Sequence, residues 1–267
     1  MTKIRAIALN TFSSLLRNKI IILFCAGCIC VLLLLLTPLL VLRNGGRGQS
    51  PEMMQMAVLP IIATMMQFVS GFGSLLAAWS AADAVAGEMR SGTVLAVLAR
   101  PVRRWQFLLG KFLGVQMMML IFVVLMLGLN YLLAWIGGAT ISTNPWVLIV
   151  YPMVRYMIYS ALGILLVTVM HPILAFCIVL VMMIAAGLVA PANPETFIPG
   201  WLRTGLFYIL PSSNLLSETR FLTITRATLR AALWTDHATA LVYGLDYALV
   251  CFLLAAWIFR SRSLSRD

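Results

Sequence analysis

The side chains best suited to metal chemistry are methionine and cysteine, and both types lie within apolar stretches. The methionine run 117–119 carries thioethers, which suit Cu(I). Successive residues of a helix point about 100° apart, so such a triplet does not converge on one ion. Cys25, Cys28 and Cys30 have a spacing that metals use, but no histidine lies nearby. We therefore interpret both groups as apolar packing residues and expect no metal site.

Residues for acid–base or nucleotide chemistry are sparse. His171 and His237 are the two histidines, and the eight acidic residues are scattered, so no catalytic set can be assembled. Gly110-Lys111 ends like a phosphate-binding loop, but Phe112 follows and the upstream glycine is missing. The sequence predicts no enzyme and no cofactor in this chain, and a membrane enzyme is the weakest interpretation.

The composition requires a membrane. Apolar residues make up 62% of the 267 residues and charged residues 10%, too few to cover a soluble fold. The net charge of +11 does not indicate nucleic acid, because lysine and arginine gather at the ends of apolar segments, where they set orientation and contact lipid headgroups. We expect one transmembrane domain, 1–267.

Six apolar segments predict an all-α, polytopic fold. Segments inside lipid must be helical unless they alternate as in a barrel, and no such alternation is present. The predicted spans are 20–42, 57–82, 112–136, 146–170, 173–190 and 238–259.

The lysines and arginines outside these spans predict the orientation. Twelve lie in the N-terminal tail, the loop between spans two and three, and the C-terminal tail, against six on the opposite side. By the positive-inside rule both termini are cytoplasmic. Residues 2–19 predict an amphipathic helix lying on the membrane, with a disordered basic tail as the alternative. Outside, the loop 191–237 is expected to hold short helices around 201–210 and 215–233.

A polar stretch, 87–111, interrupts the apolar segments between spans two and three. Residues 87–99 predict a short helix parallel to the membrane. Arg100 is disfavoured in a helix before Pro101, which can then begin the helix entering span three. Glu88, Ser91, Gly92 and Leu95 would share one face of the first helix, as a docking surface. A merely solvated loop is the alternative.

Two charges lie inside predicted spans. Arg155 and Asp246 are each about 12–13 Å from the outer end of their span, at 1.5 Å per residue. Pairing reduces the cost of a charge in lipid, so we predict an Arg155–Asp246 pair, either structural or substrate-binding. Small residues on the spans predict close helix packing: Gly71, Gly73, Ala77, Ala78, Gly163 and Gly187.

The polar stretch resembles the loop of type-2 ABC transporter permeases. The residues that match the pattern are Glu88, Gly92, Thr93, Leu95, Leu98, Pro101, Val102, Arg103, Leu109, Gly110 and Lys111. The segment 15–19 is similar to the family's elbow helix, and 208–211 to another recurring segment. The chain departs from the pattern at Arg100, where many relatives carry a small polar residue.

The resemblance implies a partner and a mechanism. Two copies of the chain would pair in the bacterial inner membrane, each binding one ABC ATPase subunit that holds ATP and Mg²⁺. The residues implied in this coupling are Glu88, Arg90, Ser91, Gly92, Thr93, Leu95, Leu98, Pro101 and Arg103, with a second contact at His171.

Two functions follow from the resemblance. The first is a permease exporting an amphipathic or lipid-like substrate. The alternative is a transmission subunit that couples ATP hydrolysis to a periplasmic assembly factor, as in metalloenzyme maturation, docking through 191–237 without moving a solute. The discriminating observations are a transported molecule or a protein partner that stimulates ATP hydrolysis.

Overall fold

The computed structural model describes residues 2–45, 51–91, 103–136, 145–189 and 233–261, with short pieces at 205–206, 210–212 and 215–217. The described residues form helices and no strand, which confirms the helical fold class. The helices are α1 (Thr2–Leu16), α2 (Lys19–Gly45), α3 (Pro51–Ser91), α5 (Arg104–Ile136), α6 (Pro145–Val167), α7 (Pro172–Val189) and α9 (Leu233–Ser261).

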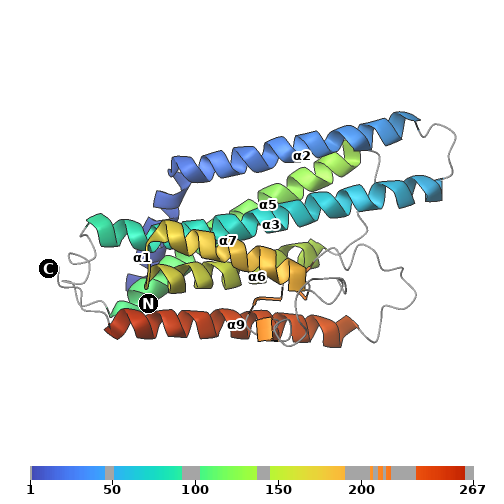
Figure 1. The fold of residues 1–267 in the computed structure, drawn as a ribbon. Helices are drawn as coiled ribbons and strands as arrows, with labels where there is room; N and C mark the ends of the chain where they lie inside the picture. Colours follow the sequence, from blue (N-terminus) through green and yellow to red (C-terminus); the bar gives the residue numbers. More distant parts are fainter. Residues whose placement is uncertain are drawn as a thin grey trace.

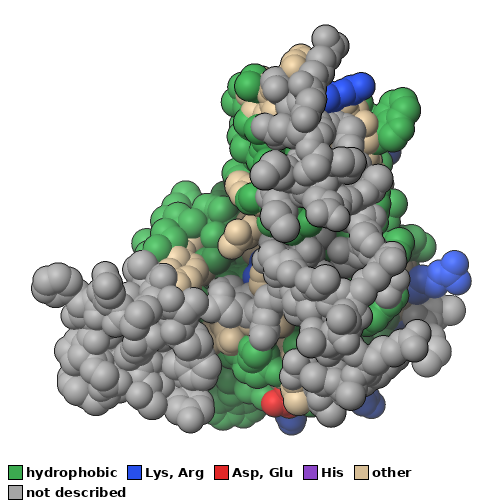
Figure 2. All heavy atoms as spheres, turned by 90° about the vertical axis from the view of Figure 1, so that its right-hand side faces the viewer, with side chains coloured by type: hydrophobic (Ala, Val, Ile, Leu, Met, Phe, Trp, Pro, Cys, Tyr) green, Lys and Arg blue, Asp and Glu red, His purple; other side chains and the backbone are tan. Residues whose placement is uncertain are grey.

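The six helices from α2 to α9 run in alternating directions, and α1 crosses one end of the bundle (Figure 1). The last turn of α3, the first turns of α5, the turn before α7 and the last turn of α9 lie at this same end (Figure 1). We call it the loop end, because residues 92–102 join α3 to α5 there. Seen from the opposite end, the visible described side chains are mostly hydrophobic (Figure 2).

Five helices are long and apolar enough to cross a membrane: Lys19–Asn44, Ala57–Glu88, Arg104–Ile136, Pro145–Val167 and His237–Ser261. The chain is therefore a multi-pass membrane protein, as predicted. The fifth predicted span, 173–190, corresponds to α7, whose apolar part Pro172–Gly187 is shorter. The 18 residues of α7 extend for about 27 Å, slightly less than the roughly 30 Å of bilayer hydrocarbon. The prediction of six spans is not confirmed for this segment.

Helix α3 extends further than predicted. It continues past residue 82, the predicted end of span two, and ends at Ser91. No proline interrupts 83–91, so leaving the apolar region does not end the helix. Residues 87–91 therefore belong to α3 and do not begin a separate helix, while 92–102 lie outside the described residues. Helix α5 begins at Arg104, three residues after the predicted start at Pro101.

Helices α3 and α6 share the most extensive contact between elements of the bundle. A Cβ atom on Gly163 would lie 2.6 Å from the Ala78 carbonyl oxygen, and one on Gly73 would lie 2.1 Å from the Tyr156 hydroxyl oxygen. These two glycines therefore permit the helices to approach closely, as predicted. Gly71 and Gly187 have nothing within 4 Å of such a Cβ, so they play no comparable part within the described chain.

Candidate functional site

An ion pair joins the two helices that flank residues 92–102. Lys111 of α5 donates its Nζ to the carboxylate of Glu88 in the last turn of α3. The Lys111 side chain is 5% exposed and that of Glu88 22%, so water screens the pair weakly. Lys111 Nζ also lies 5.7 Å from the centroid of the Phe107 ring, a cation–π contact. Removing either charge would leave the other partly buried and uncompensated.

The start of α5 is fixed by its own sequence. Arg103 precedes the helix, and its backbone N–H donates to Gln106 Oε1 at 3.1 Å. The Arg103 carbonyl in turn accepts from the N–H of Gln106 at 2.9 Å. A glutamine at the third helical position that reaches back to the capping residue satisfies a donor that would otherwise lack a partner. Arg103 thus sets where α5 begins, while its side chain is exposed.

The start of α5 is also attached to the end of α9. Arg104 Nη1 donates to the carbonyl oxygens of Phe259 at 3.0 Å and Arg260 at 3.1 Å. These carbonyls belong to the last turn of α9, where intrahelical partners are missing and a cation is favourable. The rings of Phe107 and Phe259 stack with centroids 6.1 Å apart. Two hydrogen bonds and one ring contact thus attach the start of α5 to the last turn of α9.

A second polar contact attaches the α1–α2 junction to α3. Asn18 Nδ2 donates to Asp83 Oδ2 at 2.9 Å, and Asn18 Oδ1 accepts from the N–H of Ile20 at 3.0 Å. The latter bond caps the start of α2. One asparagine thereby holds the junction in place on α3.

Helix α1 packs directly on α5. A Cβ on Gly110 would lie 2.7 Å from Ile7 Cγ2, and one on Gly114 would lie 2.7 Å from the Ala8 carbonyl oxygen. Thr11 is buried on the same face of α1 as Ala8. The predicted helix at 2–19 is thus present as Thr2–Leu16, in place of a disordered tail. Its position on a membrane surface stays a prediction.

The predicted coupling residues are distributed unevenly over the described chain. Glu88 lies in α3, and of Arg90 and Ser91 the structure describes the helical backbone. Gly92, Thr93, Leu95, Leu98 and Pro101 lie outside the described residues. His171 is exposed in the turn immediately before α7, and its Nδ1 accepts from the N–H of Ile173 at 3.4 Å. The loop end thus contains Glu88, Arg103 and His171, with Glu88 paired internally and less exposed than a docking charge would be.

The two charges predicted to pair inside the membrane are not brought together. Arg155 is 8% exposed, and its Nη1 donates to Ser70 Oγ of α3 at 2.7 Å. Asp246 is exposed on the surface of α9, and no ion pair joins it to Arg155 within the described residues. The position of a residue along a helix gives its depth in the membrane, but it does not give the side of the helix on which the residue lies. Arg155 faces α3, whereas Asp246 faces outward.

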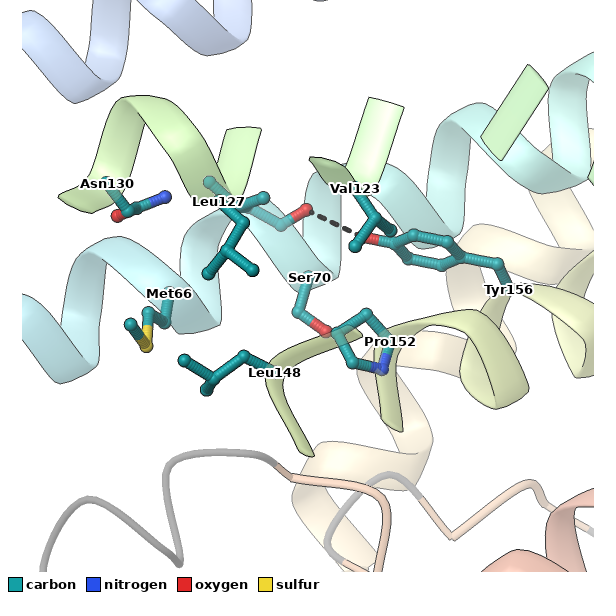
Figure 3. Close-up of a pocket in the computed structure, with 9 residues that line it drawn as sticks. Met66, Ser70, Val123, Leu127, Asn130, Leu148, Pro152 and Tyr156 are labelled. Carbon is teal, nitrogen blue, oxygen red and sulfur yellow. Dashed lines mark hydrogen bonds between the residues drawn. The ribbon is translucent and has the colours of Figure 1, made fainter. Parts of the chain in front are cut away.

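A small cavity lies beside Ser70, between α3, α5 and α6 (Figure 3). Its volume is about 30 Å³, room for one or two water molecules. Asn130 and Tyr156 also line it, and the Tyr156 hydroxyl donates to the Val69 carbonyl at 3.4 Å (Figure 3). A cavity of this size does not pass a solute.

Several polar contacts between helices were missed by sequence reasoning. Gln116 Nε2 donates to Ser160 Oγ at 2.7 Å, and Tyr151 bonds to the imidazole of His237. A glutamine inside an apolar run is a visible signal, since buried amides need partners. The partner itself requires knowing which helices are neighbours. Among the described residues, no group of three or more His, Cys, Asp or Glu could hold a metal ion.

Long apolar helices, alternating in direction and cross-linked by charged side chains at one end, define a multi-pass helical membrane protein. The sequence matches the model of the ABC-2 family transporter protein over residues 5–264. The chain therefore belongs to this family of type-2 ABC permeases, as the resemblance implied. It is the membrane subunit of an ABC transporter, which acts with a separate ABC ATPase subunit. A search of curated proteins gave no match.

Proposed function

We propose that this chain couples ATP hydrolysis by its ATPase partner to the export of an amphipathic or lipid-like substrate, with residues 92–102 receiving the force. The Glu88–Lys111 pair carries the proposal. It joins the helices on either side of 92–102, so a push on that segment moves the end of α3 and the start of α5 together. Arg104 then passes the movement to α9, and Asn18 links α3 to the α1–α2 junction.

The proposed assembly contains two copies of this chain and two ATPase subunits in a bacterial inner membrane. Each copy would span the membrane six times, with α7 as the fifth span, α1 as an elbow helix on the surface, and both termini cytoplasmic. The charge count supports this orientation, as does the location of the last turn of α3, the first turns of α5 and the turn before α7 at one end of the bundle (Figure 1). His171 would be a second, smaller ATPase contact. ATP and Mg²⁺ would be held by the ATPase, with no cofactor in this chain.

The substrate proposal follows from the surfaces. The cavity inside the bundle holds one or two waters, so a route for a larger molecule would run between the two copies or along their faces. Exposed apolar side chains on α2, α5 and α9 fit an amphipathic molecule better than a polar solute. The alternative is transmission of force to a periplasmic assembly factor through 191–237. Experiments on the reconstituted complex distinguish these two functions. Export requires movement of a lipid-like probe, whereas transmission requires that the periplasmic protein stimulates ATP hydrolysis.

The ATPase contact is tested by Leu95→Asp, which would place a charge in the apolar part of the docking segment. We expect the variant to lose most of the ATPase in co-purification, because an apolar contact becomes an uncompensated carboxylate. Ser261→Asp is the matched control, since Ser261 is exposed at the loop end and receives the same charge. Co-purification of Leu95→Asp at the level of the control would contradict the docking assignment.

A further inference from the structure

A second feature of the loop end is an apolar groove of about 550 Å³ between α1, α5 and α6. Its floor is a row of α5 side chains, Leu109, Leu113, Met117 and Leu120, with Met153 of α6 alongside. Arg5 of α1 lines one end. The groove is separate from the Glu88–Lys111 pair, and neither residue lines it.

The groove arises from how α1 meets α5. Gly110 and Gly114 let the α1 backbone approach α5 closely. The four floor residues recur at intervals of three and four, so they form one continuous face of α5. From residue 109 to residue 120 this face extends for about 16 Å. Leu113, Met117 and Leu120 are 40%, 41% and 45% exposed, so the face lacks a covering element in the described chain.

The end of the groove near α1 is basic and aromatic. Arg5 is exposed, and within the described residues no hydrogen bond or ion pair involves its guanidinium. Trp105, one helical turn before Leu109 on the same face of α5, is 44% exposed. Tryptophan and arginine are the side chains typical of the headgroup level of a membrane. Helix α1 also contains Lys3 and no acidic residue, so the field at this end is positive.

We propose that the groove binds a phospholipid with a net negative headgroup. The phosphate would pair with Arg5, Trp105 would lie at the headgroup level, and one acyl chain would run along the face from Leu109 to Leu120. Arginine binds phosphate through charge-assisted hydrogen bonds, and the apolar groove matches an acyl chain in length and chemistry. The bound lipid is a component of the permease fold, attached where α1 meets α5, and is separate from any transported substrate.

The proposal is tested by native mass spectrometry of the purified permease–ATPase complex exchanged with phosphatidylglycerol or phosphatidylcholine. The intact complex should retain phosphatidylglycerol in preference to phosphatidylcholine. Arg5→Gln should lower this preference by about fivefold, the effect of one basic residue near an anionic surface. Met117→Trp should lower retention of both lipids by filling the groove. Arg17→Gln and Leu125→Trp are the matched controls, because both residues are exposed and lie outside the groove, and they should leave retention unchanged.

Equal retention of the two lipids by the unmodified complex would overturn the proposal, as would unchanged retention in Arg5→Gln and Met117→Trp. The occupant is identified by a photoreactive residue at position 113 in phosphatidylglycerol membranes. A lipid adduct on α5 supports the proposal. A covalent dimer would show that a second copy covers this face, and would overturn it.

Discussion

The loop end and the middle of the bundle are held together in different ways. At the loop end, side chains that carry full charges connect helix ends: Lys111 binds Glu88, and Arg104 binds the last carbonyls of α9. Glycines bring helices close at both places, α1 to α5 at the loop end and α3 to α6 in the middle. In the middle, however, the charged side chain of Arg155 donates to a neutral hydroxyl, that of Ser70. Charged pairs fix which helix ends move together, while close packing makes the helices behave as one body.

This difference means that the two regions should contribute differently to the coupled movement of the helices and to the stability of the fold. Where a glycine lets two helices touch, an added atom has no room and lowers the free energy of unfolding. Changes at these contacts should therefore act mainly on stability. The Glu88–Lys111 pair lies at the edge of the core, where one side chain is partly exposed. Its loss should uncouple the movements of α3 and α5, a readout that changes in the packed middle do not share, and the uncompensated charge left behind should also lower stability. Changes in the two regions should therefore have different readouts.

Among changes in the packed middle, the largest effect on stability is expected from Gly163→Ala. The added Cβ would lie 2.6 Å from the Ala78 carbonyl oxygen, and a backbone atom cannot move aside without shifting α3. Overpacking of this kind costs about 1–3 kcal/mol, so the midpoint of thermal unfolding of the purified permease should fall clearly. Gly71→Ala is the control, because nothing lies within 4 Å of its added Cβ. If the two variants unfold at the same temperature, the packed middle is not as close as described.

A smaller effect is expected from Ser70→Ala, which removes the acceptor of the Arg155 hydrogen bond. A buried bond to a charged group contributes about 1.5–3 kcal/mol, and the adjacent cavity can admit water that restores part of it. The unfolding midpoint should fall by less than in Gly163→Ala, with export activity lowered no further than stability explains. Asp246→Asn should leave the midpoint unchanged, because Asp246 is exposed. A larger fall in the unfolding midpoint for Asp246→Asn than for Ser70→Ala would support Asp246 as the partner of Arg155 and contradict the Arg155–Ser70 contact.

Hydropathy predicted the helices well and their ends poorly. The apolar runs gave the positions of α2, α5, α6 and α9 because lipid leaves a chain little choice but a helix. The same reasoning ended span two at residue 82, since Asp83 and Glu88 are polar. Polarity marks where a segment leaves the apolar layer, and α3 continues to Ser91 because nothing there opposes a helix. Residue 82 is a predicted membrane boundary, and Ser91 is the helix end.

The candidate site was predicted as a set of residues, and its contacts were not. Glu88 and Lys111 both fall in the motif that suggested the family, but their pairing depends on α3 and α5 lying side by side. The Arg155–Asp246 prediction failed to anticipate Ser70 for a related reason. Sequence gives the height of each charge along its helix, whereas the rotation of the helix is decided by packing, here by Gly73 and Gly163 between α3 and α6.

The central claim is that the Glu88–Lys111 pair transmits the movement of the ATPase to the helices. It is tested most directly by pulsed electron resonance between spin labels at Leu34 of α2 and Leu125 of α5. Both side chains are more than half exposed, so the labels disturb little. Distances are compared with and without ATP plus vanadate, which traps the ATPase, in the complex and its Glu88→Lys, Lys111→Glu and doubly exchanged variants.

The account predicts that trapping the ATPase changes the distance between the two spin labels when Glu88 and Lys111 are both present. It predicts no shift in either single variant, although the ATPase still co-purifies, and recovery of most of the shift when both residues are exchanged. A full shift in Glu88→Lys with the ATPase bound would contradict the claim. So would a double exchange that stays as uncoupled as the single variants.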